Sequence, residues 1–382
     1  MTYLKVTPHD PIVARDGRPF GAGSGSRMKG LGWPTPSVMA GSLRTMLGKE
    51  EPDGFINSVV TKLKSMEVAG PLPLWNGDLF FPAPKDFALR PCNAASGTPR
   101  ACFRLRPRSL AEGEYCDLPG EVPRPVLLPD EAGEEFKPEP PPAFWSSGKM
   151  AAWLGESEFP PPPESRKREP AGGFPDATEK DERTHVQIAP ERGAAAEHLL
   201  FSTISLAFPE GLSMALRVSG LDGTFAGGFH PAGGERRLAY WETAERAPWL
   251  CPSALAVKLR DAPLIRMVLA TPALFRHGWK PDWIAENREG CPPGIGVKLR
   301  LVGVTADRWT AVSGFGLEAG TVGPKPVRRM VPAGSVYFFE YVEGDREALS
   351  GSGWLAPVSD LETDGQDRRD GFGLALWGVW SE

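Results

Sequence analysis

Glycine and proline restrict the fold of this chain more than any other feature of its sequence. The 382 residues include 44 glycines and 41 prolines, which together exceed a fifth of the chain. Both residues disfavour the interior of long helices and mark turns and loops. Because 41% of the residues are apolar, the chain can still bury a large core. We therefore expect an α+β fold in which short strands and long loops predominate.

The clearest local signal is a hairpin around Asn76-Gly77. Asn-Gly between apolar runs supplies the two positive-φ residues that a tight turn needs. A helix is expected after Pro34-Thr35-Pro36, with Ser37 as its N-cap and Gly48 as its stop. The order strand, helix and hairpin is compatible with a ferredoxin-like unit. From β-branched and aromatic content, further strands are expected at 200–208, 213–218, 256–259, 265–270, 298–304 and 335–341.

Residues 111–164 form an acidic, proline-rich insertion. They hold 12 acidic residues, 3 basic residues and 12 prolines, so this segment carries −9 and the rest of the chain +4 of the total charge of −5. Such a composition favours extended segments. A second polar stretch, 164–182, is expected to be a mobile loop. Five apolar residues of the insertion are expected to form one face of a short helix that docks on the body or a partner: Phe144, Trp145, Met150, Trp153 and Leu154.

The sequence shows no membrane segment, targeting segment or metal site. No stretch approaches the roughly 20 apolar residues that span a bilayer, and the first ten residues lack the regions of a signal peptide. The five cysteines, at 92, 102, 116, 251 and 291, include no CxxC pair, which argues against a disulfide framework or a zinc site. We expect a soluble cytoplasmic protein without a membrane partner, a metal or a cofactor.

A basic, glycine-rich segment lies near the start of the chain. The first 49 residues contain seven Lys or Arg against two Asp. Among them, Arg15-Asp16-Gly17-Arg18 places two guanidinium groups on a turn-prone loop, and glycines follow at 21, 23, 25, 30 and 32. Glycine lets a backbone approach phosphate groups closely. The segment is either an RNA contact or an ordinary mobile loop with solvated charges.

Two further basic clusters occur later in the chain. Between 87 and 111 there are five arginines and no acidic residue. Arg104, Arg106 and Arg108 stand at period two, so an extended segment would turn them to one side. Pro107 restricts this ladder to an edge strand or a loop, and phosphate contact and a solvated edge remain equally open. The third cluster, 325–329, reads Lys-Pro-Val-Arg-Arg and is too short to identify a function alone.

Signals for catalysis are weak. The five histidines, at 9, 185, 198, 230 and 277, show no metal-ligand spacing, and neither a Walker motif nor a convincing GxGxxG motif is present. His9-Asp10 is similar to the HD dipeptide of metal phosphohydrolases, but further ligands cannot be identified. His185 beside Arg183, and His230 near Arg236, remain open as general base and phosphate clamp for metal-free RNA cleavage.

The order of several motifs along the chain is more specific than any one of them. They are Arg15-Asp16-Gly17-Arg18-Pro19-Phe20, Trp33-Pro34-Thr35-Pro36-Ser37, Ala40-Gly41-Ser42-Leu43-Arg44, Leu79-Phe80-Phe81-Pro82-Ala83-Pro84-Lys85-Asp86, Arg183-Thr184-His185-Val186, Gly233-Gly234-Glu235-Arg236-Arg237, Lys325-Pro326-Val327-Arg328-Arg329, Pro332-Ala333-Gly334-Ser335-Val336-Tyr337-Phe338 and the glycine-rich segment 371–380. In this order they resemble the RAMP superfamily of CRISPR proteins, and within it the third-subunit family of the Cmr (type III-B) effector complex.

The resemblance implies two ferredoxin-like (RRM-like) modules with long loop insertions and glycine-rich loops. On this basis we expect an N-terminal module at 1–110, the acidic insertion with its helix and mobile loop at 111–182, and a C-terminal module with a glycine-rich terminal segment at 183–382. The resemblance also implies that the loops hold the repeat-derived 5′ tag of the guide RNA. Since the RNP1 consensus for stacking on a sheet is missing, binding by loops is the expected mode.

The implied partners are the guide RNA, the large polymerase-like subunit and the first backbone subunit, and no catalytic role is implied. A metal-independent guide-RNA-processing endoribonuclease of the same superfamily and a purely protein-binding adaptor remain open. The charge of the insertion would repel RNA, so we expect it to face solvent or protein. The candidate RNA-binding residues are Arg15, Arg18, Lys29, Ser37, Arg44, Arg183, His185, Arg236, Arg237, Lys325, Arg328, Arg329, Gly371 and Gly373.

Overall fold

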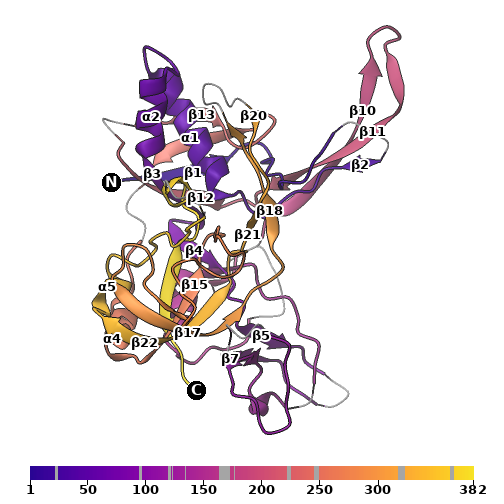
Figure 1. Ribbon diagram of the computed structural model, residues 1–382. Coiled ribbons are helices and arrows are strands. Elements are labelled where there is room, and N and C mark those ends of the chain that lie inside the picture. Colours follow the sequence, from indigo (N-terminus) through magenta and orange to yellow (C-terminus); the bar gives the residue numbers. More distant parts are fainter. Residues whose placement is uncertain are drawn as a thin grey trace.

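Two antiparallel sheets and one projecting hairpin make up most of the molecule (Figure 1). Strands outnumber helices, which confirms the expected α+β class. None of the helices that the structure describes is both long and apolar enough to cross a membrane. The computed structural model describes residues 1–21, 25–93, 97–118, 122, 124–133, 135–162, 173–175, 177–221, 225–244, 249–316, 323–361 and 365–382.

The first sheet has seven strands in the order β13-β14-β1-β12-β3-β4-β9, and all neighbours run antiparallel. Helices α1 (Pro36–Glu50) and α2 (Asn57–Ser65) cover one face of it (Figure 1). Leu43 and Leu63 of these helices share one buried cluster with Val6 and Trp241 of the sheet. The strands are β1 (Thr2–Pro8), β3 (Glu67–Trp75), β4 (Asp78–Pro82), β9 (Phe144–Ser146), β12 (Leu212–Ser219), β13 (Gly228–Pro231) and β14 (Leu238–Thr243).

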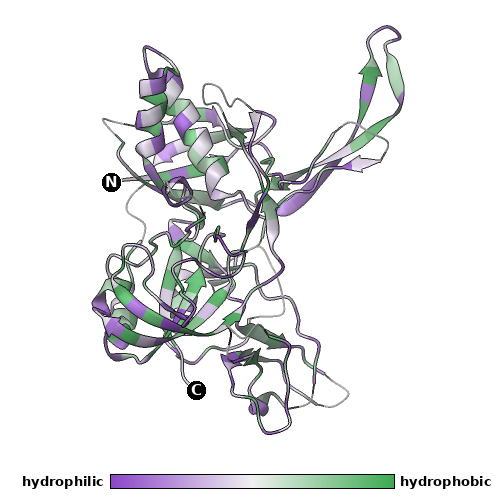
Figure 2. Ribbon diagram, viewed as in Figure 1, coloured by the Kyte–Doolittle hydropathy of each residue, from purple (hydrophilic) through white to green (hydrophobic). Residues whose placement is uncertain are grey.

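The second sheet has five strands in the order β16-β17-β22-β15-β23. Its central strand β22 carries Tyr337, Phe338 and Phe339, all fully buried, so both faces of this sheet are covered. Hydrophobic residues recur along the strands of both sheets (Figure 2). Helices α3 (Ser147–Leu154) and α4 (Ser253–Asp261) contact β23. The remaining elements of this half are β15 (Leu264–Leu269), β16 (Glu289–Gly290), β17 (Val297–Thr305), β22 (Val336–Gly344), α5 (Glu347–Ser350), α6 (Gln366–Arg369) and β23 (Ala375–Val379).

A long hairpin of β10 (Glu179–Ala189) and β11 (Ala194–Ala207) projects from the body (Figure 1). Its outer part exposes Val186, Ile188 and Leu200 to solvent. Its base is anchored, because Leu206 belongs to a buried cluster of the body and strand β2 (Ser26–Arg27) pairs in parallel with β11.

Short two-stranded ribbons complete the fold. The ribbon of β18 and β21 runs between the two sheets (Figure 1). These elements are β5 (Phe87–Arg90) with β6 (Ala101–Arg104), β7 (Arg106–Pro107) with β8 (Val126–Leu127), β18 (Thr310–Val312) with β21 (Arg328–Met330), β19 (Phe315–Gly316) with β20 (Gly323–Pro324), and the 3-10 turn η1 (Asp130–Ala132).

A buried ion pair fastens the acidic insertion to the second sheet. Asp86 and Arg266 are 0% and 1% exposed, and Arg266 Nη1 donates to Asp86 Oδ2 at 2.7 Å. The indole N–H of Trp153, from α3, donates to Asp86 Oδ1 at 2.8 Å. Glu156, just beyond α3, lies 3.1 Å from Arg266 Nη2. The end of the insertion is therefore part of the core and not a free linker.

The apolar residues predicted to dock on the body do so. Trp145, Met150, Trp153 and Leu154 lie in the main buried cluster, and Phe144 lies in a smaller one. The prediction of one continuous helix was wrong for Phe144 and Trp145. They form strand β9, which extends the first sheet beside β4, and the helix begins only at Ser147.

Most of the other predicted elements are confirmed. Asn76 and Gly77 join β3 to β4 with φ values of 48° and 87°, and five of the six further strands are present as β11, β12, β15, β17 and β22. The segment 256–259 is instead part of α4. Leu255 and Leu259, four residues apart, are both buried, which is the spacing of one helix face.

Helix α1 and the predicted loop 164–182 have different bounds from those expected. The N-cap of α1 is Thr35, and Ser37 lies inside the helix, because proline is well suited to the first helical position. Gly48 does not stop this helix. A side chain there would lie 2.3 Å from the ring of Phe55, so the glycine permits packing. Strand β10 already begins at Glu179, whereas Gly23 and the loop residues 164–172 and 176 lie outside the described residues.

Candidate nucleic-acid interface

Residues 12–21 and 25–31, here called the junction segment, contact three distant parts of the chain. Ile12 exchanges backbone hydrogen bonds with Leu206 at the base of the long hairpin, at 2.9 and 2.8 Å. Val13 O accepts from the N–H of Gly234 at 3.0 Å, and Gly17 donates to Ala311 O of β18 at 3.0 Å. The long hairpin, the loop 232–237 and the ribbon of β18 and β21 are thereby held around one short segment.

The junction segment presents four cations at its surface, and one of them, Arg27, pairs with Glu182 of the long hairpin. Arg15, Arg18 and Lys29 are exposed, and Arg15 pairs with Gly30 in a β-bridge that folds the segment back on itself. Asp16 is almost fully buried and accepts from Arg18 N at 3.0 Å and from Arg18 Nε at 2.5 Å. The buried carboxylate thus holds the Arg15–Arg18 loop in one shape while the side chain of Arg18 stays 61% exposed.

The third basic cluster lies on the ribbon beside the junction segment. Val312 and Met330 pack inward in one buried cluster with Ala14 of the junction segment. Arg329 is exposed on the other side of β21, and Lys325, half-buried, directly follows β20. The basic clusters near both ends of the sequence therefore lie together, as their RNA-contact interpretation requires.

Two predicted residues lie on the long hairpin. Arg183 is exposed and pairs with Asp181 at 2.8 Å. His185 shares a hydrogen bond of 2.9 Å between its Nε2 and the hydroxyl of Thr203, and its ring stacks on Phe201 at 5.3 Å. Phe201 also meets Phe20 of the junction segment at 6.0 Å.

Arg236 and Arg237 lie in the loop 232–237 between β13 and β14. Arg236 is exposed and has a positive φ of 51°. The loop is fixed on both sides, because Gly234 bonds to Val13 and Gly233 N donates to the hydroxyl of Ser42 on α1 at 3.3 Å. The loop therefore carries its arginines to the edge of the junction segment.

Arg44 and Arg328 form ion pairs within the protein. Arg44 Nη1 lies 2.5 Å from Asp370, and its other nitrogens donate to backbone carbonyls at the end of α2. Arg328 Nη1 lies 2.7 Å from Asp367, which is 4% exposed. Both pairs fasten the segment around α6 to more distant parts of the chain, so these arginines position other residues.

Ser37, Gly371 and Gly373 do not lie on the exposed cationic surface. Ser37 is half-buried in the first turn of α1, with its hydroxyl 3.2 Å from that of Thr35. A side chain at Gly371 would lie 2.4 Å from Val68 O, and one at Gly373 would lie 2.7 Å from the hydroxyl of Ser359. Both buried glycines allow backbone segments to approach one another.

The arginine ladder 104–108 is occupied by protein carboxylates. Arg104 and Arg106 lie 3.4 and 2.5 Å from the two carboxylate oxygens of Glu156. Arg108 pairs with Glu114 at 3.3 Å and with Asp130 at 3.0 Å. The ladder neutralises the acidic insertion, and we assign it no RNA contact.

The histidines lie apart from any cluster suited to a metal ion. Within the described ranges, no group of three or more His, Cys, Asp and Glu side chains could hold one. Burial lowers the pKa of His230, so its imidazole is neutral at pH 7. Its Nδ1 faces the carbonyl of Pro231 at 3.0 Å.

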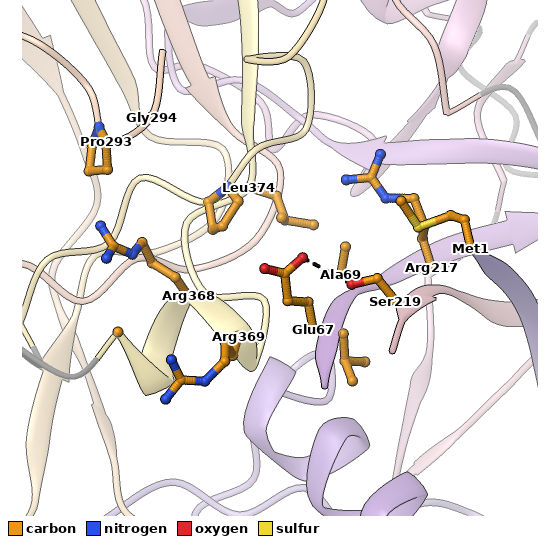
Figure 3. Close-up of a pocket in the computed structure, with 13 residues that line it drawn as sticks. Met1, Glu67, Ala69, Arg217, Ser219, Pro293, Gly294, Arg368, Arg369 and Leu374 are labelled. Atoms are coloured by element: carbon orange, nitrogen blue, oxygen red, sulfur yellow. Dashed lines mark hydrogen bonds between the residues drawn. The ribbon is translucent and has the colours of Figure 1, made fainter. Parts of the chain in front are cut away.

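A pocket of about 390 Å³ opens between the two sheets (Figure 3), and no described residue of the junction segment is among those that line it. Three arginines line it, namely Arg217, Arg368 and Arg369, but their guanidinium groups point in different directions and the carboxylate of Glu67 stands between them (Figure 3). The arrangement does not converge on one anion, and we assign it no ligand.

Sequence reasoning missed the aromatic residues of this surface. Trp309 is 51% exposed and Phe315 is 64% exposed, and the guanidinium of Arg329 lies 4.8 Å from the centre of the Trp309 ring. The sequence signal that could have identified Trp309 is its position in a polar run, Ala-Asp-Arg-Trp-Thr at 306–310. The short ribbon that follows this run was not predicted from the sequence.

The chain is similar to one known protein family and, at low identity, to chains of several solved structures. A family model described as CRISPR-associated protein (Cas_Cmr3) matches residues 4–380. No curated protein matches the sequence. A chain of a type III-B Cmr-beta complex bound to cognate target RNA and AMPPnP shares 14% identity, covering 88% of this chain and 86% of that chain, with a TM-score of 0.48. A chain of a Cmr-beta complex bound to cognate target RNA shares 18% identity, with 88% of this chain and 86% of that chain covered and a TM-score of 0.45. A chain of a type III-A Csm3–Csm4 subcomplex shares 10% identity, with 90% of this chain and 94% of that chain covered and a TM-score of 0.35.

Proposed function

The chain belongs to the Cmr3 family of CRISPR-associated proteins, and we propose that it is a non-catalytic subunit of a type III-B (Cmr) effector complex that binds the 5′ tag of the guide RNA. The observation that carries the proposal is the meeting of distant basic segments around the junction segment. Exposed Arg and Lys on glycine-containing loops neutralise phosphates, and nearby backbone N–H groups add donors without charge. The residues that we assign to phosphate contact are Arg15, Arg18, Lys29, Arg183, Arg236, Arg237, Lys325 and Arg329.

We propose that each sheet is the core of a ferredoxin-like module. In the first, β12 lies between β1 and β3, and β14 flanks β1; in the second, β22 lies between β15 and β17, and β23 flanks β15. Both orders follow the split βαβ arrangement. In the first module α1 and α2 both stand between β1 and β3, where that fold has its first helix, and the described residues between β12 and β14 contain no helix. In the second module α5 and α6 stand between β22 and β23, whereas the segment between β15 and β17 contains no helix.

We propose that the subunit joins the large polymerase-like subunit to the backbone of the complex. Exposed apolar residues support such protein contacts. They lie on the long hairpin, at Val186, Ile188 and Leu200, and on the edge of the first sheet, at Phe229 and Tyr240. The two groups belong to different elements, which suits two different partners.

The non-catalytic role is part of the proposal, and a metal-independent guide-processing ribonuclease is its alternative. His185 bonds to Thr203 and His230 to the carbonyl of Pro231, and among the described residues neither shares a hydrogen bond with an arginine, so neither forms a ready pair of base and phosphate clamp there. Labelled repeat RNA incubated with the purified protein distinguishes the two functions. Cleavage supports the nuclease, and retention without cleavage supports the scaffold.

The RNA surface is tested by the salt dependence of guide binding in the reconstituted complex. Arg15→Ala/Arg18→Ala and Lys325→Ala/Arg329→Ala should weaken guide binding. They should also reduce the slope of the logarithm of the binding constant against the logarithm of salt concentration by about 0.7 for each lost phosphate contact. The matched control is Arg260→Ala/Lys298→Ala, which removes two exposed or half-exposed cations on α4 and β17, in the other half of the molecule (Figure 1). If both test variants keep the wild-type slope, the RNA lies on another surface.

A further inference from the structure

Trp309 differs from every other tryptophan of the protein in its exposure. The chain has 12 tryptophans, all within the described residues, and Trp309 alone is exposed. Its side chain is 51% accessible. Leaving a large aromatic ring in water forgoes the free energy that its burial would contribute, and the fold buries or half-buries the other eleven. An exposed tryptophan in such a chain indicates a surface that receives a ligand.

The strand geometry holds the ring of Trp309 beside a cation. Ala311 of β18 pairs with Arg329 of β21, and Trp309 lies two residues before Ala311, on the same side of the ribbon. The guanidinium of Arg329 stands 4.8 Å from the ring centre. On the opposite side, Val312 and Met330 are buried. The ribbon therefore has an anchored side and a side that presents an aromatic ring together with a positive charge.

Positive charge surrounds this ring. Arg308 precedes it and is exposed. The free edge of β18 receives the N–H of Gly17 at Ala311, which brings the loop of Arg15 and Arg18 to the same strand. Asp307 is the sole acidic residue in the ranges 305–316 and 323–331, and Lys85 lies 2.6 Å from it. The surroundings favour a polyanion over an acidic or neutral protein surface.

We infer that Trp309 is a stacking platform for one unpaired base of the RNA held at the junction segment, with Arg329 as its cationic companion. This inference rests on the proposed function and adds to it the residue that contacts a base. Aromatic rings between phosphate-binding cations are how single-stranded nucleic acids are held, because every base has a π-face that can stack. Phe315, 64% exposed on the adjoining strand β19, offers a second ring farther along the ribbon.

The test uses the reconstituted complex with an intact guide RNA and with a series of guide RNAs, each of which has a single abasic nucleotide at a different tag position. Trp309→Ala should lower the affinity for intact RNA about 5-fold to 100-fold, the range that loss of one stacked base gives. Trp309→Phe should retain most of the affinity. For RNA that is abasic at one particular position, Trp309→Ala and wild type should bind alike. Tyr115→Ala is the matched control, since Tyr115 is an aromatic residue 93% exposed in the acidic insertion.

The possible results separate this inference from the function on which it rests. If wild type binds guide RNA and Trp309→Ala binds equally well, the stacking platform is refuted and the proposed function stands. If wild type does not retain guide RNA, the proposed function fails, and the platform with it. If Trp309→Ala retains RNA but loses partner subunits during purification, the ring serves protein docking, which also overturns the inference. An unchanged melting temperature for Trp309→Ala excludes misfolding as the cause of lost affinity.

Discussion

Gly17 donates its backbone N–H to the carbonyl oxygen of Ala311 at 3.0 Å and so joins the basic loop near the N-terminus to a strand near the other end of the chain. The approach is close enough to exclude a side chain. A Cβ atom at Gly17 would lie 2.7 Å from the carbonyl carbon of Val312, and backbone atoms cannot yield as a flexible side chain can.

Gly17→Ala should therefore separate the loop from the ribbon. We expect guide affinity in the complex to fall several-fold, together with a loss of stability of about 1–3 kcal/mol, as overpacking typically causes. Gly32→Ala is the control, because no atom lies within 4 Å of a Cβ placed there. Equal guide affinities for the two variants would show that the contact between loop and ribbon is not needed for RNA binding.

Replacement of the histidines tests the absence of catalysis. His9→Ala, His185→Ala and His230→Ala should each leave target cleavage and second-messenger synthesis by the assembled complex largely intact. His185 shares its hydrogen bond with the hydroxyl of Thr203, and Nδ1 of His230 faces the carbonyl of Pro231, so contacts within the protein occupy both side chains. Complete loss of target cleavage, with assembly and guide binding preserved, would contradict the scaffold role.

The stability that Asp86 and Arg266 each contribute should depend on the presence of the other. Asp86→Ala removes the carboxylate closest to a guanidinium that is 1% exposed, and removal of one buried partner costs about 3–5 kcal/mol. Glu156 remains 3.1 Å from Arg266, so we expect the lower end of that range. Asp86→Ala/Arg266→Met should lose less than the sum of the losses of Asp86→Ala and Arg266→Met.

Urea denaturation measures these free energies of unfolding. Arg260→Ala, which breaks the exposed pair with Glu347, should cost less than about 1 kcal/mol and serves as the control. Additive losses in the double variant would mean that the two buried charges do not depend on each other.

Cysteine alkylation tests the packing around the main buried cluster, which Cys102 and Cys251 contact. Burial raises the pKa of Cys251 to about 12 and raises that of Cys102 as well. Because the thiolate is the reactive form, iodoacetamide should modify these two cysteines slowly in the native protein at pH 8. Cys116 and Cys291 are exposed and should react faster with iodoacetamide, as followed by peptide mass spectrometry. After denaturation in urea the difference should disappear, and comparable native rates for Cys251 and Cys291 would disprove the burial.

Within the acidic insertion we expect residues 111–118 to be dispensable and residues 147–154 to be essential for folding. Residues 111–118 are all exposed, so their deletion should leave the melting temperature and guide retention near the wild-type values. Deletion of 147–154 removes α3 and the buried Trp153, and should unfold the protein. Crosslinks from guide RNA mainly to 111–118 would place the RNA on the face that its negative charge argues against.

Local rules predicted the parts of this fold that depend on neighbours in sequence. Asn76-Gly77 determines its own turn conformation, and the hairpin was found where it was expected. The failures came from packing across distance. The segment 256–259 has β-branched and apolar residues, yet it is helical because Leu255 and Leu259 bury one side against the second sheet.

The sequence predicted which kinds of residue form the candidate surface, but not how these residues are arranged in space. Basic residues beside glycines pointed to the loops, but charge alone could not distinguish Arg329, which is exposed, from its neighbour Arg328, which is paired with Asp367. That difference follows from the alternation of side chains on β21 and from a carboxylate far along the chain. Nothing local to Gly371 indicated that it accommodates the carbonyl oxygen of Val68.

The contact between the junction segment and β18 also sets an order of events during synthesis. The ribosome releases the N-terminus first, and domains begin to fold as they emerge. The junction segment can pair with the long hairpin once Leu206 has been made, but its bond to Ala311 must wait until most of the chain has been translated. Contacts of such sequence separation are also slow to form. The surface that we assign to the guide is therefore completed late, so a nascent or prematurely terminated chain would carry the first basic loop without the strand that supports it.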